Sequence, residues 1–134
     1  MPLEELDIWS ESAANSKIET ILLAAPTTPD ERLLQICARS AGFVYAVGLL
    51  GVTGMRSELA DSATEIASRL KNVTSKPVLV GVGIGSPEQA VEACKVSDGV
   101  IVGSAIVQEM INGSSPEEVG ELVSTFRDAL DKNC

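Results

Sequence analysis

The stretch from Val78 to Gln108 constrains the fold of this chain more than any other part of it. It contains two short apolar runs that are each followed by glycines, and a helix-length segment separates them. The runs are Val78-Leu79-Val80 and Val100-Ile101-Val102. This pattern predicts a strand, a turn, a helix, a second strand and a second turn. Because a helical crossover joins parallel strands, we expect both strands to end at the same edge of one sheet.

The glycines at this edge predict a binding site for the phosphate of a small metabolite. Gly81, Gly83 and Gly85 follow the first strand, and Gly103-Ser104 follows the second. Backbone N–H groups that small residues leave open can surround a phosphate, and a helix that begins after Gly103 adds its dipole. In (β/α)8 barrels the loops after strands 7 and 8 commonly hold a phosphate. The alternative is that these glycines only form tight turns.

The length and the charge of the chain exclude several classes of protein. A chain of 134 residues is long enough for one domain with a core, but a complete (β/α)8 barrel needs about 250. The net charge of −9 argues against binding to nucleic acid or to an anionic membrane, and 3% aromatic residues argue against base stacking. No apolar run reaches the roughly 18 residues of a membrane span. With no basic signal segment at the N-terminus, we expect a cytoplasmic protein.

The reactive side chains are few. The three cysteines, Cys37, Cys94 and Cys134, have spacings that fit no metal motif, so we expect reduced, at least partly buried thiols and no metal site. Histidine is absent. Any acid–base chemistry must therefore use carboxylates, Tyr45 or lysine.

The rest of the chain repeats the same alternation of strand and helix. Further strands are expected over Lys17–Ala25, with residues 21–23 buried, and over Phe43–Val47. Helices are expected over residues 2–15, 28–40, 61–72, 86–96, 104–111 and 115–130. Thr28, Ser86 and Ser115 each begin a helix as N-cap, with proline next and Glu or Gln at the third position. Thr28 and Ser115 lie 87 residues apart, which gives 29 residues for each of three βα steps.

We therefore predict one α/β domain over residues 1–134 with four parallel strands. Four strands do not close a barrel, because small barrels need about eight. The strands near Ile21 and Val100 should be open edges. We expect the isolated chain to self-associate, to pair with a missing half-barrel, or to aggregate.

Several motifs along nearly the whole chain are similar to one family, the tryptophan synthase alpha subunit. Its fifth strand and following loop resemble Leu22–Arg32, LLAAPTTPDER. Its sixth strand and mobile loop resemble GFVY at 42–45 and GVTG at 51–54. Strands seven and eight with their phosphate loops, and the start of the helix after strand four, resemble residues 80–84, 102–107 and 2–5. The resemblance implies the C-terminal half of a (β/α)8, or TIM, barrel, from the helix after strand four to the last helix.

The resemblance also implies an activity. The family is a lyase of tryptophan biosynthesis that cleaves indole-3-glycerol phosphate to indole and glyceraldehyde 3-phosphate, without a cofactor, and passes indole to a beta subunit. Tyr45 would lie near the indole, and Thr53 would belong to a closing loop. The phosphate would be held by Gly54, Gly83, Gly103 and Ser104.

The chain departs from the family in its acids. The family's catalytic glutamate lies on strand two and its second acid in the loop after that strand, and neither region is present here. The ends of the four expected strands carry no Asp, Glu, Lys or His. We therefore expect the chain to be inactive alone. The alternatives are a non-catalytic half-barrel that self-associates and binds a phosphorylated ligand, and a phosphate-binding barrel enzyme of another pathway.

Overall fold

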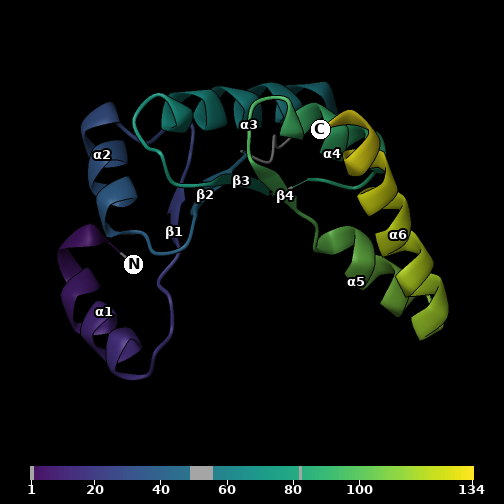
Figure 1. The fold of residues 1–134 in the computed structure, drawn as a ribbon, viewed down its shortest axis with the longest axis horizontal. Coiled ribbons are helices and arrows are strands. Elements are labelled where there is room, and N and C mark those ends of the chain that lie inside the picture. Colours follow the sequence, from purple (N-terminus) through teal and green to yellow (C-terminus); the bar gives the residue numbers. More distant parts are fainter. Residues whose placement is uncertain (1, 49–55, 82) are drawn as a thin grey trace.

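A computed structural model describes residues 2–48, 56–81 and 83–134, and the side chains of all of these except 56–61. Strands and helices alternate along the chain (Figure 1). The strands are β1 (Leu22–Ala24), β2 (Val44–Val47), β3 (Val78–Gly81) and β4 (Gly99–Ile101). The helices are η1 (Leu3–Glu5), α1 (Leu6–Asn15), α2 (Asp30–Arg39), α3 (Arg56–Lys71), α4 (Pro87–Cys94), α5 (Ser104–Ile111) and α6 (Pro116–Asn133).

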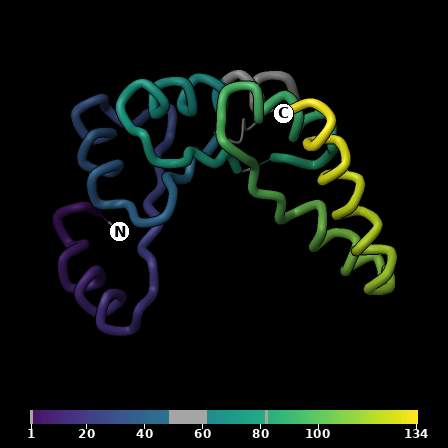
Figure 2. Tube along the Cα trace, viewed as in Figure 1, coloured from purple at the N-terminus to yellow at the C-terminus, as the bar shows by residue number. Residues whose placement is uncertain are grey.

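The four strands form one parallel sheet in the order β1-β2-β3-β4. Strands that follow one another in the sequence are therefore neighbours in the sheet. The chain passes along an arch from α1 at one foot to α5 and α6 at the other (Figure 2). This confirms the predicted fold class, a parallel α/β half-barrel with flanking helices.

Helices cover only one face of the sheet, and the core lies there. Alternate strand residues point to this face, and five of them are almost fully buried: Ala24, Val44, Ala46, Val78 and Val80. They pack against apolar side chains of α2, α3 and α4, such as Leu33, Ile66 and Ala90. Phe126 of α6 joins the same cluster and α6 packs against α4. The alternation of buried and exposed positions places the other side chains on the concave face of the arch.

The concave face overturns the expectation that residues 21–23 are buried. Ile21 is 36% and Leu23 60% exposed, and β1 is limited to three residues. An apolar run predicts burial on both faces of a strand, but this sheet has helices on one face only. Leu23 therefore remains exposed even though it lies in a strand, as predicted.

Arginine side chains of α2 and α3 hold these helices to distant parts of the chain. Arg39 of α2 donates to the Leu3 carbonyl oxygen at 2.9 Å and pairs with Asp7, which holds η1 and α1 against α2. Arg69 of α3 donates to the Thr28 carbonyl oxygen at 2.6 Å and to Asp30 at 2.7 Å. These contacts fix the loop between β1 and α2.

Two of the three predicted helix starts are correct. The Ser115 hydroxyl accepts from the Glu118 N–H at 3.3 Å, and the Glu118 carboxylate accepts from the Ser115 N–H at 2.6 Å, a complete capping box. Ser86 caps α4. Thr28 is not an N-cap, because its hydroxyl accepts from the Ala25 N–H at 3.0 Å.

The cysteines differ from the expectation of reduced thiols. Cys94, at the end of α4, and Cys134, at the end of α6, form a disulfide across 40 residues of sequence. Cys37 is a free, buried thiol, as expected, and burial raises its pKa. The prediction of free thiols is therefore wrong for the pair that joins α4 to α6.

Among the described residues, no helix has both the length and the apolar character needed to cross a membrane.

Candidate functional site at the glycine-bearing edge of the sheet

Gly83 and Gly103 follow neighbouring strands and lie at the same edge of the sheet. Gly81 of β3 is paired with Ile101 of β4 in a parallel register. Gly83 and Gly103 are each two residues beyond this pair. The structure therefore brings together the two glycine turns that the sequence placed at a common edge.

The start of α5 is open to a ligand. Gly103 is the residue before the helix, no side chain caps it, and a Cβ at this position would meet nothing within 4 Å. Gly103 and Ser104 are both exposed. The first N–H groups of a helix have no partner within the helix and carry its positive dipole end. Together these features suit an anion at the start of α5.

Gly83 shapes the neighbouring turn. Its φ of +82° lies in the left-handed region that glycine adopts without strain. A side chain at Gly83 would therefore be strained whatever the space around it.

The start of α4 is already occupied by groups of the chain itself. The Gln89 side chain accepts from the Gly85 N–H at 2.8 Å, and the Ser86 hydroxyl accepts from the Gln89 N–H at 3.4 Å. A hydrogen bond with Ser86 lowers the pKa of Glu88 and keeps that carboxyl ionised at the helix start. A phosphate would meet a negative charge there, so α5 provides the better site.

Tyr45 of β2 lies on the concave face, and its ring extends over β3, the strand that precedes Gly83. A Cβ added to Gly81 would overlap the Tyr45 hydroxyl and stand 2.7 Å from its Cε1 atom. The Tyr45 ring thus crosses from β2 onto β3, and the bare backbone of Gly81 makes room for it. Sequence reasoning treated Gly81 as one more turn glycine and missed this role. The role of Gly81 follows from its pairing with Val47 of β2, and that pairing depends on the register between the two strands.

Two of the predicted site residues, Thr53 and Gly54, lie outside the described residues, as does the rest of the expected closing loop at 51–54.

The chemistry available at this edge is limited. Where the described strands end, the sequence carries no Asp, Glu, Lys or His, and histidine is absent from the whole chain. In the described part of the chain, no group of three or more His, Cys, Asp or Glu could hold a metal ion. Asp98 precedes β4 at the opposite edge, where it pairs with Lys71 at 2.8 Å. The described strand ends thus offer no carboxylate, amine or imidazole for proton transfer, and the Tyr45 hydroxyl lies beside Gly81.

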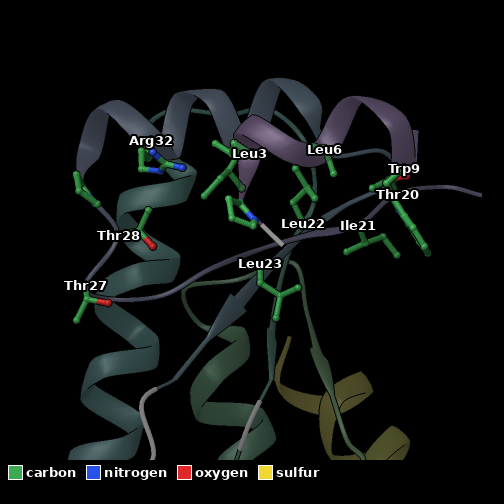
Figure 3. Close-up of a pocket in the computed structure, with 13 residues that line it drawn as sticks. Leu3, Leu6, Trp9, Thr20, Ile21, Leu22, Leu23, Thr27, Thr28 and Arg32 are labelled. Atoms are coloured by element: carbon green, nitrogen blue, oxygen red, sulfur yellow. The ribbon is translucent and has the colours of Figure 1, made fainter. Parts of the chain in front are cut away.

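A separate groove of about 640 Å³ runs beside β1. It lies between α1, β1 and the start of α2, and its wall is largely apolar (Figure 3). Leu3, Leu6 and Leu22 gather beneath η1 and α1, and Trp9 stands at one end. None of its lining residues belongs to the glycine turns after β3 and β4.

Comparison with known proteins decides the family. Residues 1–132 match the family model described as tryptophan synthase alpha chain. The chain belongs to the tryptophan synthase alpha chain family.

Curated members of the tryptophan synthase alpha chain family cover almost all of the chain. The protein of Trichodesmium erythraeum is 43% identical over an alignment of 134 positions, which covers 97% of this chain and 51% of that protein. The protein of Arabidopsis thaliana is 42% identical over 119 residues, or 88% of this chain and 43% of the relative. The chain thus spans about half the length of the curated relatives it matches.

Solved tryptophan synthase structures share the fold. A structure of tryptophan synthase from Mycobacterium tuberculosis in an aminoacrylate-bound form has a TM-score of 0.78 at 30% identity, and the match covers 95% of this chain and 46% of that one. The tryptophan synthase complex of Pyrococcus furiosus gives a TM-score of 0.80 at 31% identity, over 96% and 51%. The half-barrel of tryptophan synthase alpha chains is therefore the architecture of this chain.

Proposed function

We propose that this chain provides the phosphate-binding half of a site that cleaves indole-3-glycerol phosphate to indole and glyceraldehyde 3-phosphate. The observation that carries the proposal is the juxtaposition of Gly83 with Gly103 and Ser104 at the uncapped start of α5. Membership of the alpha chain family supports this substrate. By the same resemblance, Gly54 would complete the phosphate contacts.

In this proposal the chain binds and orients the substrate. Backbone N–H groups at the start of α5 hold the phosphate, and the indole lies toward Tyr45 on the concave face. Breaking the carbon–carbon bond to indole requires a group that protonates the ring carbon and one that takes a proton from the glycerol hydroxyl. The described strand ends supply neither group. A second half-barrel with two carboxylates would have to supply both, so the chain alone should be inactive.

The family membership also supports a partner. In the proposed assembly the completed barrel passes indole to a tryptophan synthase beta subunit, and Thr53 belongs to the loop that closes over the substrate. We place this reaction in the cytoplasm, in tryptophan biosynthesis. The Pyrococcus furiosus structure is described as a tryptophan synthase complex, which agrees with an assembly of this kind.

The experiment measures binding first and turnover second. Glycerol 3-phosphate is titrated into the purified chain by calorimetry, beside Ser104→Glu and, as a control, Ser124→Glu on the exposed surface of α6. A carboxylate at the start of α5 repels the phosphate, so S104E should weaken binding by about tenfold or more, whereas S124E should not. Equal affinity of all three proteins would contradict the site.

Turnover is then measured after mixing the chain with the half of the Trichodesmium erythraeum alpha chain that this chain does not match. Indole release in the mixture, and none from either half alone, is the expected result. A properly folded mixture that binds glycerol 3-phosphate and releases no indole would favour the second candidate, a non-catalytic phosphate-binding module. The absence of acids and bases at the described strand ends is the observation that favours this candidate.

A further inference from the structure

The disulfide between Cys94 and Cys134 encloses the segment that carries Gly103 and Ser104. The two cysteines are 40 residues apart, and β4, α5 and α6 lie between them in the sequence. The start of α5 therefore belongs to a covalently closed loop. Gly83 lies outside this loop, in the turn after β3. The bond thus limits how far one part of the candidate phosphate site can move from the other.

A hydrogen-bonded turn joins α5 to α6. The Ser114 N–H donates to the Glu109 carbonyl oxygen at 3.1 Å, and the Ser114 hydroxyl donates to the Glu109 carboxylate at 2.7 Å. The Gly113 N–H donates to the Met110 carbonyl oxygen at 3.2 Å, and the capping box at Ser115 begins α6 directly afterwards. The two helices also pack against each other. A movement of α6 is therefore transmitted to α5.

The far end of α6 is held to α4. Phe126 of α6 is buried in the core cluster, and α6 packs against α4 (Figure 1). Cys134 follows the last turn of α6, where its N–H donates to the Leu130 carbonyl oxygen at 2.8 Å, and Cys94 is the last residue of α4. The Cα atoms of the two cysteines are 6.4 Å apart, a separation that disulfides usually span. The bond thus joins the helix that follows the Gly83 turn to the helix that holds α5.

The disulfide is open to thiols in solution. Cys134 is exposed, whereas Cys94 is partly buried and Cys37 is buried. A reductant can therefore reach the bond from the Cys134 side. In the cytoplasm, where we place the proposed reaction, thiols are normally reduced, and the disulfides that occur there are usually transient and redox-sensing. An accessible disulfide in such a protein is suited to a reversible change of redox state.

We propose that the Cys94–Cys134 disulfide is a reversible redox lock that orders α5 and α6 and thereby sets the affinity of the start of α5 for phosphate. With the bond closed, α6 stays against α4, and the N–H groups at the start of α5 keep the position in which they bind. With the bond open, α6 and α5 detach more often, and the affinity falls with the fraction of ordered molecules. The effect on phosphate rests on the proposed function, whereas the effect on α5 and α6 does not.

Opening the lock is a two-electron reduction by a dithiol. One thiolate of the dithiol attacks the Cys134 sulfur, the bond between the two protein sulfurs breaks, and Cys94 leaves with the electron pair and takes up a proton. The second thiolate of the reductant then displaces Cys134, which also takes up a proton, and the reductant departs as its own disulfide. A low-molecular-weight disulfide such as oxidised glutathione closes the lock by the reverse exchange.

The first test counts thiols and measures amide hydrogen exchange, and neither measurement needs a ligand. Under denaturing conditions the chain should show one reactive thiol after treatment with oxidised glutathione and three after dithiothreitol. Reduction should speed exchange in α5 and α6 by about tenfold or more, because these helices then open locally, and should leave β1, β2 and α2 unchanged. Cys134→Ser should exchange at the faster rate with and without reductant.

The second test titrates glycerol 3-phosphate into the oxidised and the reduced chain by calorimetry. Reduction should raise the dissociation constant by about three- to tenfold, because fewer molecules have an ordered α5. Cys37→Ala is the matched control, since it removes the buried thiol and keeps the disulfide. It should respond to reductant as the wild type does. Cys134→Ser should bind with the weaker affinity in both conditions.

The outcomes distinguish a failure of the lock from a failure of the phosphate site. Equal exchange of α5 and α6 in both redox states, or three reactive thiols after oxidation, would overturn the lock whatever the phosphate result. Faster exchange on reduction with an unchanged affinity for glycerol 3-phosphate would overturn the link between the lock and the site. Faster exchange on reduction with no binding by the oxidised chain would contradict the phosphate site and support the ordering of α5 and α6 by the disulfide.

Discussion

The Tyr45 ring can lie across β3 only because Gly81 has no side chain. A Cβ at Gly81 would overlap the Tyr45 hydroxyl, and the residue is buried in a strand, so neither the ring nor the backbone has much room to move. The position of Tyr45 beside the glycine turns therefore requires that residue 81 has no Cβ atom.

Gly81→Ala should destabilise the fold by about 1–3 kcal/mol through overpacking. Urea denaturation of the chain measures the change. Tyr45→Ala combined with Gly81→Ala should recover part of that loss, because the overlapping ring is removed. Gly120→Ala, in the exposed surface of α6 with nothing within 4 Å of its Cβ, serves as the control. It should stabilise by about 0.5–1 kcal/mol, since alanine loses less backbone entropy in a helix. Equal costs at the two glycines would argue against the Tyr45 contact.

Asp98 makes stability depend on acid pH. The Lys71 ammonium, at 2.8 Å, and the Val78 N–H, at 2.8 Å, hold the pKa of this carboxyl below its usual value. A lowered pKa in the folded state gives stability that is present above the unfolded pKa of about 4 and is lost as the pH falls through the folded pKa.

Asp98→Asn should therefore cost about 1 kcal/mol at pH 6, a modest value because the pair is partly exposed. The difference between Asp98→Asn and the wild type should shrink at pH 3. Urea denaturation at both pH values measures it. Lys71→Gln should cost less, because the bond from the Val78 N–H remains. A difference that is the same at both pH values would contradict the assigned role.

At the scale of elements, α5 has the bounds that the sequence predicted, and α6 begins at the predicted cap. Ser115 and Glu118 form the capping box that their spacing indicated, because both partners lie in one local turn. The start of α2 was misplaced because the Thr28 hydroxyl already accepts from the Ala25 N–H, three residues earlier. Arg69, 41 residues away, donates to the Thr28 carbonyl oxygen of the same turn. The spacing of residues predicts a cap only where no other group uses the capping hydroxyl.

The disulfide between Cys94 and Cys134 should stabilise the chain. It closes 40 residues of sequence and thereby restricts the unfolded state, an effect of about 2–4 kcal/mol. Reducing agent should therefore lower the melting temperature by roughly 10 °C. In Cys134→Ser the melting temperature should already be low, and reducing agent should have no further effect. Identical melting of the wild type with and without reductant would show that the bond contributes nothing.

At the scale of the whole molecule, sequence predicted the order and direction of all four strands but not which side chains are exposed. The spacing of the βα units determines the order and direction of the strands, because consecutive units are usually neighbours in the sheet. Exposure depends on what covers each face of the sheet. Leu23 and Val80 both read as buried strand residues, yet one is 60% and the other 0% exposed. The position of Tyr45 over Gly81 likewise required the register between strands.

The fluorescence of Trp9 can report on the groove beside β1. Trp9 is the only tryptophan in the sequence, it is 53% exposed, and it stands in the groove beside β1 (Figure 3). Indole fluorescence shifts to shorter wavelength when water leaves its surroundings. Any molecule that fills this groove would therefore shift the emission wavelength of the unlabelled protein, and the time course of that shift would give the rate at which the groove is filled.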